Sequence, residues 1–469
     1  MRPRDARSKE PTATENRGHA MGMTGNKAGA ALQESDVELL KKQFQADTAL
    51  RIVQNAVTRV TVDDVAIDRA IVNEADHTMS ASLDDWKVTS QGKSGRCWLF
   101  AGLNLLRPGT MAKLNVKEFE FSQNYMMFWD KLERANYFLE AIIETAGRDI
   151  DDRTVAYLLD SVAGDGGQWN MFVALVDKYG LVPKSFMPET QSSSETARMN
   201  SLLRAVLRKG ALAVRAAAAK DVDAARDRKA DILQVVYRIL SIHLGTPPER
   251  FLWQWQDKDK SFHRDGSLTP KEFAKSYGTL PIDDYVCLVH DPRPTSPTNR
   301  TYTVEYLGNV LGAPPVKYLN VEIAVMKDLT ARAIESGEPV WFGCDVSKMM
   351  SNDYALWDAK LFDYDSVYAT SLGLSKAERL IAHESQMTHA MLFTGVDRVD
   401  GVPRRWRVEN SWGAERGRDG FYTMNDSWFD EYLFEIAARR ELLPPDLQEA
   451  LDAEPTVLPA WDPMGALAN

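Results

Sequence analysis

A cysteine, a histidine and an asparagine in this chain are flanked and spaced in a way that could support nucleophilic catalysis. Cys97 follows a turn made by Gly92 and Gly95 and opens the apolar stretch CWLFAGLNLL, which predicts a buried helix that ends at Pro108. The unpaired N–H groups and the dipole at the start of a helix favour negative charge, so Cys97 is a candidate thiolate. A thiolate nucleophile also needs a base that accepts and later returns a proton, and histidine suits that role near neutral pH.

His389 is the candidate base among the seven histidines of the chain. It stands at the start of the apolar run HAMLFTGVD (389–397), and a second strand-like run, RRWRVENSW (404–412), contains Asn410. A lone histidine at a strand start is more often structural. Asn410, however, could orient the imidazole through its amide oxygen, and Trp412 could shield that bond from water. The sequence therefore predicts a cysteine–histidine–asparagine catalytic group.

The elements that must position these residues form a helical first half and a strand-rich last part. Helical patterns cover residues 121–143 and 164–183, and the second begins with a glycine-rich loop and should stop at Gly180. Residues 190–245, rich in Ala, Arg, Met and Leu, predict long inserted helices. Strands are predicted over residues 302–307, 339–346, 389–397 and 404–412. The pattern predicts an α+β fold with a helical half and a β-rich half around a cleft.

We expect five segments along the chain. They are a disordered N-terminal extension (1–35), the helical half with the nucleophile (36–188), an inserted helical and oligomerisation segment (189–300), the β-rich half with the catalytic His and Asn (301–455) and a C-terminal tail (456–469). The extension has almost no large apolar side chains to bury. Residues 196–220 carry six basic side chains and no acid, which predicts a solvated or subunit-facing helix surface, with a surface that faces nucleic acid as the alternative.

The composition excludes several classes of protein. The 469 residues are 44% hydrophobic and 26% charged, which are globular values and exclude a collagenous, wholly disordered or disulfide-stapled chain. A net charge of −11 makes the chain a poor ligand for phosphate backbones. Three scattered cysteines and the lack of HExxH or CxxC patterns predict no metal and no cofactor. We also expect a cytoplasmic protein without a membrane segment, because no apolar run reaches 18 residues.

The motifs resemble one family in particular. The segments SGRCW, FEFSQNYMMFWDKLER, DGGQW, WFGCDV, AERL, MTHAM, RVENSWG and PAWDPMGALA closely resemble the bleomycin hydrolase and bacterial aminopeptidase C family of papain-like cysteine peptidases, from about residue 40 to the end. Two features depart from the general papain pattern. The first cysteine of the C-G-[SA]-C-[WY] signature is replaced by Ser94, and the separation 389 − 97 = 292 exceeds the usual spacing of about 130–150 residues. The inserted helices match that surplus.

This resemblance implies the fold and the roles of the motif residues. It implies a papain-like fold with a large helical insertion, assembled as a homohexamer whose active sites face an internal cavity. Cys97 would be the nucleophile, His389 the general base and then acid, and Asn410 the residue that orients the imidazole. Gln91 would donate its amide to the oxyanion together with the backbone N–H of Cys97.

The resemblance also implies substrate-binding positions. Gly166 and Gly167 would pair their backbone with the substrate, because side chains there would block its approach; a helix-entry loop that needs positive φ is the alternative. Trp412 is assigned to the substrate side of the site. The tail would lie in the cleft and hold the substrate's amino group with the terminal carboxylate, with Asn469 slowly removed by the enzyme itself. The alternative for the tail is a frayed terminus.

The function expected from the residues and the resemblance is that of a cytosolic, thiol-dependent aminopeptidase. It would act on peptides with a free N-terminus through a cysteine thioester, and the resemblance adds bleomycin-type amides and homocysteine thiolactone as further substrates. The alternatives are an endopeptidase or a nucleic-acid-binding protein on the same fold, the latter disfavoured by net charge. A transglutaminase-type acyltransferase is disfavoured because that class usually has aspartate where this chain has Asn410.

Overall fold

The computed structural model describes residues 31–83 and 86–468, which divide into two compact units. Of these residues, the first unit comprises 31–66 with 365–370, and the second comprises 67–83, 86–364 and 371–468. Most of the expected N-terminal extension lies outside the described residues, and the first helix begins at Glu34. None of the residues in α1 (Glu34–Ala46) and α2 (Thr48–Val57) is buried, although both helices carry large apolar side chains.

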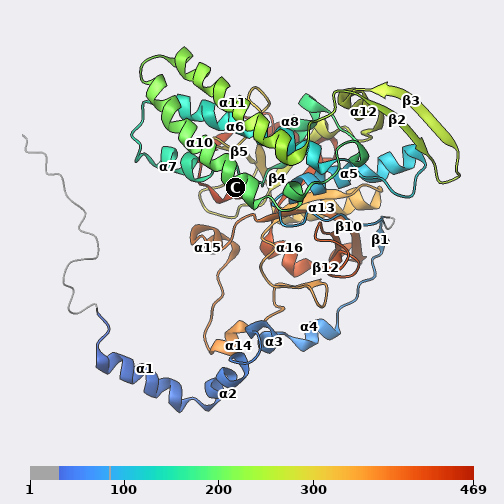
Figure 1. Ribbon diagram of the computed structural model, residues 1–469. Helices are drawn as coiled ribbons and strands as arrows, with labels where there is room; N and C mark the ends of the chain where they lie inside the picture. The colour runs from blue at the N-terminus through green and yellow to red at the C-terminus, as the bar shows by residue number, and fades with distance from the viewer. Residues whose placement is uncertain (1–30, 84–85, 469) are drawn as a thin grey trace, which may run out of the picture. The chain divides into compact units, whose positions relative to one another are not determined.

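The helices expected near the nucleophile are confirmed. They are α5 (Cys97–Leu114), α6 (Gln123–Glu144) and α8 (Trp169–Tyr179). Together with α7 (Arg153–Asp160), for which no specific prediction was made, they gather on one side of the second unit (Figure 1). The Ser122 hydroxyl caps α6 by accepting the Tyr125 N–H at 3.0 Å. Gly180 ends α8 with a φ of 73°, a value that favours glycine.

The nucleophile helix does not end at Pro108, as the sequence analysis expected. It continues for two more turns to Leu114. The helix is buried on nearly all sides, and the packing of residues such as Leu105, Leu106 and Leu114 outweighs the single backbone hydrogen bond that the proline removes. The local sequence signal was therefore overridden by tertiary packing.

The inserted segment contains the two long helices expected over residues 190–245. They are α10 (Ala197–Ala218) and α11 (Val222–Leu244), preceded by the short α9 (Gln191–Ser194), and both long helices pack against α6. The sequence analysis missed the hairpin of β2 (Phe251–Gln256) and β3 (Phe262–Leu268) that follows. Its signal was the alternation in FLWQWQ, of which Phe251 and Trp253 are buried while Leu252 and Gln254 are exposed.

Two of the basic residues in the acid-free stretch bind main-chain carbonyls, although Arg208 stays exposed to solvent. Arg208 donates to the carbonyls of Leu159 and Asp160, and Arg215 donates to the carbonyls of Thr145 and Arg148. These cations dock α10 against the ends of α6 and α7. Nucleic-acid binding by the remaining basic residues stays a prediction.

One twisted sheet carries the β-rich half. Its strands follow the order β14-β5-β6-β4-β13-β7-β10-β11-β12-β9-β8, with β1 added on β10. Their bounds are β1 (Ala81–Ser82), β4 (Tyr285–Val289), β5 (Arg300–Val304), β6 (Tyr318–Asn320), β7 (Val340–Cys344), β8 (Met350–Ser351), β9 (Leu356–Trp357), β10 (His389–Val399), β11 (Val402–Glu409), β12 (Phe421–Asn425), β13 (Leu433–Arg439) and β14 (Thr456–Leu458). The four strands predicted from the sequence are confirmed.

Short helices complete the two units, and α5 packs directly on the sheet. The remaining elements are α3 (Val62–Ala66), α4 (Arg69–Asn73), η1 (Lys184–Phe186), α12 (Pro270–Tyr277), η2 (Ile282–Asp284), α13 (Ile323–Glu335), α14 (Tyr364–Tyr368), α15 (Lys376–Ile381), α16 (Asp426–Tyr432), η3 (Arg440–Leu442), α17 (Pro445–Ala450) and η4 (Pro463–Ala468). Helix α5 contacts β7 and β10, so the start of the helix that carries Cys97 lies against the strand that begins with His389. Within the described part of the chain, no helix combines the length and apolar character that a membrane crossing needs.

Gly167 is required by packing. A Cβ placed on it would lie 2.4 Å from the indole of Trp98, closer than any real contact. Neither Gly166 nor Gly167 has a positive φ, so the alternative explanation by backbone conformation is wrong. The absence of a side chain lets the loop before α8 pack flat on the first turn of α5.

We expect Gly167→Ala to destabilise the folded protein by about 1–3 kcal/mol, because the added methyl group must displace a buried indole. Thermal unfolding monitored by calorimetry measures this as a lower midpoint. Gly147→Ala is the matched control, since a Cβ at that position meets nothing within 4 Å. Equal midpoints for the two variants would contradict the packing argument.

Candidate active site

A short antiparallel pairing joins the loop before the nucleophile to the segment after β11. Ser90 pairs with Trp412, the Gln91 N–H donates to the Ser411 carbonyl at 2.8 Å, and the Gly413 N–H donates to the Thr89 carbonyl at 3.2 Å. Farther along α5, the Asn104 amide donates to both Thr89 and the Glu409 carboxylate, at 2.8 and 2.9 Å. These bonds hold the helix of Cys97 and the strand before Asn410 at one fixed distance.

Cys97 is buried at the first position of α5, with the start of β10 beside it. The backbone N–H of Ala390 donates to its sulfur at 3.4 Å. Burial raises the pKa of the Cys97 thiol to about 11, although the N–H groups of Ala390, Trp98 and Cys97 act in the opposite direction. The resting residue is therefore a thiol, whereas the sequence analysis expected the helix N-terminus alone to favour a thiolate.

His389 and Asn410 form the expected hydrogen bond. The distance from His389 Nε2 to Asn410 Oδ1 is 2.9 Å, and the same oxygen accepts the Ser411 N–H at 2.7 Å. The second bond fixes the amide orientation, so Oδ1 is the acceptor and Nε2 carries the hydrogen. The other ring nitrogen, Nδ1, then has the lone pair that a base requires. Burial lowers the pKa of His389 to about 4, and the bond to Asn410 offsets this only in part.

Trp412 lies over this pair. Its indole and the imidazole of His389 have ring centroids 5.0 Å apart, with the planes tilted by 33°. Arg416 lies over the indole, with its guanidinium carbon 5.7 Å from the ring centroid. The aromatic cover keeps water from the His389–Asn410 bond and thereby holds the imidazole in one orientation.

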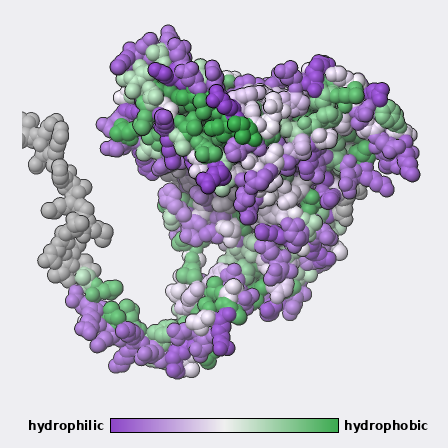
Figure 2. Space-filling view, viewed as in Figure 1, coloured by the Kyte–Doolittle hydropathy of each residue, from purple (hydrophilic) through white to green (hydrophobic). Residues whose placement is uncertain are grey.

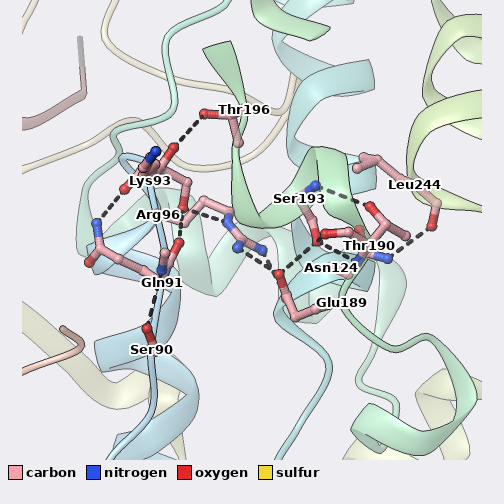
Figure 3. A network of polar contacts seen from close by, with 12 residues as sticks. Ser90, Gln91, Lys93, Arg96, Asn124, Glu189, Thr190, Ser193, Thr196 and Leu244 are labelled. Atoms are coloured by element: carbon pink, nitrogen blue, oxygen red, sulfur yellow. Dashed lines mark hydrogen bonds and ion pairs between the residues drawn. The ribbon is translucent and has the colours of Figure 1, made fainter. Parts of the chain in front are cut away.

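The side chain of Gln91 is held at both ends. Its Oε1 accepts the Ser411 hydroxyl at 2.7 Å, and its Nε2 donates to the carbonyl of Ser94 in the following turn. The amide nitrogen has two hydrogens, so one remains for a further acceptor. Figure 3 shows Gln91 within the polar network that also contains Lys93 and Arg96. The arrangement fits a donor that is fixed before the substrate binds.

The glycine pair lies next to the nucleophile but is occupied by protein contacts. Gly166 and Gly167 are both buried, and the carbonyl of Gly166 accepts a hydrogen bond from the Arg134 guanidinium. Trp98, which packs on Gly167, donates its indole N–H to the carbonyl of Asp165 at 2.7 Å. The structure thus brings the pair to the site, and its pairing with a substrate backbone stays a prediction.

The C-terminal tail is anchored and runs to the same region. Arg293 binds Asp462 through two hydrogen bonds of 3.0 and 2.9 Å, and the carbonyl of Met464 accepts the Tyr318 hydroxyl at 3.1 Å. Leu467 is buried, and its Cδ2 lies 3.4 Å from where a Cβ on Gly343 would be. Gly343 pairs with Ala390 across the sheet, so the described tail ends beside the His389 strand. Asn469 lies outside the described residues.

Several residues that hold the site together were not predicted from the sequence. Arg96, just before the nucleophile, forms two hydrogen bonds with Glu189 at 3.0 and 2.7 Å, and Figure 3 shows this pair between the catalytic loop and the inserted segment. Ser411 and Asp165 were also missed, although both stand inside motifs that the resemblance used. The sequence could have indicated Ser411 and Asp165 only through their polar type and their place inside these motifs, because their partners are distant in sequence.

The comparisons with known proteins agree with this geometry. The model of the Peptidase C1-like family matches residues 31–465. The chain belongs to the Peptidase C1-like family. The chain is 41% identical to bleomycin hydrolase of Homo sapiens over 457 residues, which cover 94% of this chain and all of that protein. It is 46% identical to aminopeptidase C of Listeria innocua over 91% of this chain and 95% of that protein.

A solved structure gives the same result. The crystal structure of PepW from Lactobacillus rhamnosis superposes with a TM-score of 0.90 at 42% identity, and the match covers 93% of this chain and 99% of that one. The chain is accordingly a papain-like cysteine aminopeptidase with the α+β fold of the Peptidase C1-like family. The helical insertion of this chain lies within the matched length, so it is shared with these relatives.

The lowered pKa of His389 predicts a specific dependence of stability on pH. The folded pKa of about 4 is below the ordinary histidine value of 6.5, so between these values the unfolded chain binds the extra proton and folding weakens as pH falls. From about pH 7 to about pH 4.5, the wild type should lose about 2–3 kcal/mol more free energy of unfolding than His389→Gln. Urea unfolding at both pH values measures the difference.

Cys97→Ala is the matched control for this experiment, because it keeps the buried imidazole and should keep the pH dependence of the wild type. If the wild type and His389→Gln lose equal stability on acidification, the imidazole is not neutral in the folded protein.

Proposed function

We propose that this peptidase removes N-terminal residues by acyl transfer through a thioester on Cys97. The observation that carries the proposal is the placement of the Cys97 sulfur against the Ala390 N–H, next to a His389 ring that Asn410 orients. A nucleophile, a base with a free lone pair and an orienting group thus come from three distant parts of the chain into one buried site.

In the first half of the reaction, the sulfur of Cys97 attacks the carbonyl carbon of the substrate while Nδ1 of His389 accepts the thiol proton. The C–N bond then breaks, and His389 gives that proton to the leaving amine. In the second half, His389 takes a proton from water, the hydroxide attacks the thioester carbon, and the C–S bond breaks. The acid is released and His389 returns the proton to Cys97, so the site is restored.

The oxyanion formed in both halves requires fixed donors. The free hydrogen of the Gln91 amide and the backbone N–H of Cys97, which has no partner within its own helix turn, supply two of them. Gln91 is 6% exposed, so its donor acts in a site from which water is largely excluded.

The tail supports removal of single N-terminal residues over cleavage inside a chain. Met464 and Leu467 belong to the same buried apolar cluster as Cys97, and Leu467 fills the space beside Gly343. A substrate residue that extended into that space would clash with the tail. The carboxylate that follows Leu467 by two residues would then meet the substrate's ammonium group, which is the basis for preferring a free N-terminus.

The substrate range follows from this arrangement. Peptides with a free amino terminus are the proposed main substrates, and bleomycin-type amides are added because the relatives include bleomycin hydrolases. Homocysteine thiolactone is a cyclic thioester and would be opened by the same attack. A reducing cytosolic location would keep the nucleophile as a thiol, and all three cysteines of the chain are free in the structure.

A peptide with a free N-terminus and its acetylated twin distinguish the two kinds of peptidase. We expect the wild type to trim only the free peptide. Cys97→Ala should lose at least 1,000-fold in kcat/KM because it lacks the nucleophile. A chain that ends at Asp462 should cleave the acetylated peptide. That shortened chain keeps the Arg293–Asp462 anchor but lacks Met464 and Leu467. Mass spectrometry of the products identifies the bond that is cut.

Cys287→Ala is the matched control, because Cys287 is buried on β4 and donates to Asn170 at 3.2 Å, outside the site. Equal cleavage of both peptides by the wild type would identify an endopeptidase. If the shortened chain cuts neither peptide, the tail is needed for folding rather than for selection.

We also propose that the chain assembles with copies of itself, as a homohexamer. Several large apolar side chains on the long inserted helices are exposed, and Figure 2 shows hydrophobic residues gathered over this region. Leu212 and Ile242 have exposed fractions of 60% and 75%. In the other unit, Leu39 and Leu40 of α1 are 55% and 57% exposed. Exposed apolar surface of this kind marks contacts between protein chains.

Sedimentation velocity tests the assembly. We expect a species with six times the chain mass, and the double variant Leu212→Asp, Ile242→Asp should sediment as a smaller species because charges at a buried interface are strongly unfavourable. Arg228→Asp is the control, since Arg228 is exposed and forms only a long ion pair within its own helix. Sedimentation of the wild type at the mass of one chain would remove the proposal.

A further inference from the structure

A single peptide unit in the catalytic loop connects the oxyanion donor to a buried acid. The carbonyl of Ser94 accepts the hydrogen bond from the Gln91 side chain, and the N–H of Gly95, in the same peptide unit, donates to Asp165 Oδ2 at 3.1 Å. A Cβ on Gly95 would lie 2.9 Å from the Cβ of Asp165, so this close approach needs glycine. Gln91 and Asp165 are therefore connected through two hydrogen bonds and one planar group.

Asp165 is itself fixed by three other side chains. Lys131 of α6 forms an ion pair with it at 2.7 Å, and its two oxygens accept the Asn200 amide at 2.7 Å and the Thr196 hydroxyl at 2.5 Å. The side chains of Lys131 and Asp165 have exposed fractions of 1% and 9%. The carboxylate thus takes its place from α6 and from the inserted helix α10 together.

The carboxylate is ionised at neutral pH. Burial acts to raise the pKa of Asp165, but the Lys131 ammonium and the hydrogen bonds from Lys131, Thr196 and Asn200 hold it well below its usual range. An anion that accepts a peptide N–H polarises that peptide and makes its carbonyl oxygen a stronger acceptor. The Ser94 carbonyl consequently binds the Gln91 amide more firmly than it would without the Asp165 anion on the same peptide.

Two contacts then determine where the free N–H of Gln91 points. Ser411 holds Oε1 from the side of the β-rich half, and the polarised Ser94 carbonyl holds one hydrogen of Nε2 from the side of the catalytic loop. Figure 3 shows the same loop bound a second time to α10's N-terminal region, through Lys93 and Thr196. The loop is therefore positioned by the inserted segment as well as by the catalytic halves.

We propose that Asp165 is a positioning residue of the oxyanion hole, which acts on Gln91 through the Ser94–Gly95 peptide. It touches neither substrate nor the reacting atoms. The inference rests on the proposed roles of Cys97 and Gln91. It also means that the inserted helices help to position the oxyanion donor, because Thr196 and Asn200 hold Asp165 in place.

A double-mutant cycle tests whether Asp165 acts through Gln91. Hydrolysis of a chromogenic amino-acid amide with a free amino group is measured for the wild type, Asp165→Asn, Gln91→Ala and the double variant. Asp165→Asn should lower kcat about 10–100-fold with KM changed less than about 3-fold, since removal of an oxyanion donor lowers kcat about 100–1,000-fold. In the Gln91→Ala background the same change should lower kcat by less than about 3-fold.

Multiplied losses in the double variant would overturn the proposal, and so would an unchanged kcat for Asp165→Asn. A wild type that does not hydrolyse the amide at all would instead remove the proposed function. If Asp165→Asn does not fold, Thr196→Val takes its place in the cycle, because it keeps the carboxylate and removes one of its hydrogen bonds. Its loss in kcat should be smaller and should again vanish without Gln91.

The pH dependence of Cys97 alkylation by iodoacetamide provides a second readout. A general structural defect is not expected to lower the pH midpoint of this alkylation. The charge of Asp165 raises the pKa of the Cys97 thiol. Asp165→Asn should therefore shift the pH midpoint of alkylation downward. Glu338→Gln is the control, since this carboxylate binds Tyr285 and Arg439 on β4 and β13, and it should leave both kcat and the midpoint unchanged. An unchanged or raised midpoint for Asp165→Asn would count against the proposal.

Discussion

The pairing of residues 89–91 with residues 411–413 is the contact on which the site depends. Gln91 belongs to one side of this pairing, Cys97 follows it six residues later, and Asn410 immediately precedes the other side. The buried bonds of Asn104 to Thr89 and Glu409 hold the same two parts of the chain a few residues away. Buried polar groups lose free energy when their partners are removed, so the two halves cannot slide against each other without breaking several such bonds at once. This register brings residues from the helical half and from the β-rich half into one arrangement.

Burial determines the chemical state of that arrangement. It disfavours charge on both the thiol and the imidazole, so the resting site holds a neutral pair. In the proposed reaction, the thiol proton would move when a carbonyl is attacked. The same dry surroundings strengthen fixed donors such as the Gln91 amide, because little water competes with them. On the proposed mechanism, burial would disfavour a resting thiolate but would strengthen the stabilisation of the charge that develops during the reaction.

The sequence predicted the parts whose signal is local. Cys97, His389, Asn410 and the strands and helices that carry them were found from type, spacing and periodicity, because each lies at an element boundary that turns and apolar runs define. The end of α5 was missed because its packing outweighs the local effect of Pro108. The reason for Gly167 was missed because it depends on Trp98, which is about seventy positions away. Asp165 was missed for the same reason, since Lys131 and Asn200 come from other helices.

The lack of a side chain on Gly343 leaves space beside the sheet for which the C-terminal tail and a bound peptide would compete. A Cβ on Gly343 would lie 3.1 Å from the Met387 sulfur and 3.4 Å from Leu467 Cδ2, so Leu467 packs close beside this backbone, and the Arg293–Asp462 pair tethers Leu467 a few residues away. A ligand on so short a tether is present at an effective concentration on the order of millimolar. On the proposed function, a peptide that needs this space would have to compete with that local concentration, so the tail would act as a built-in competitive inhibitor of long peptides.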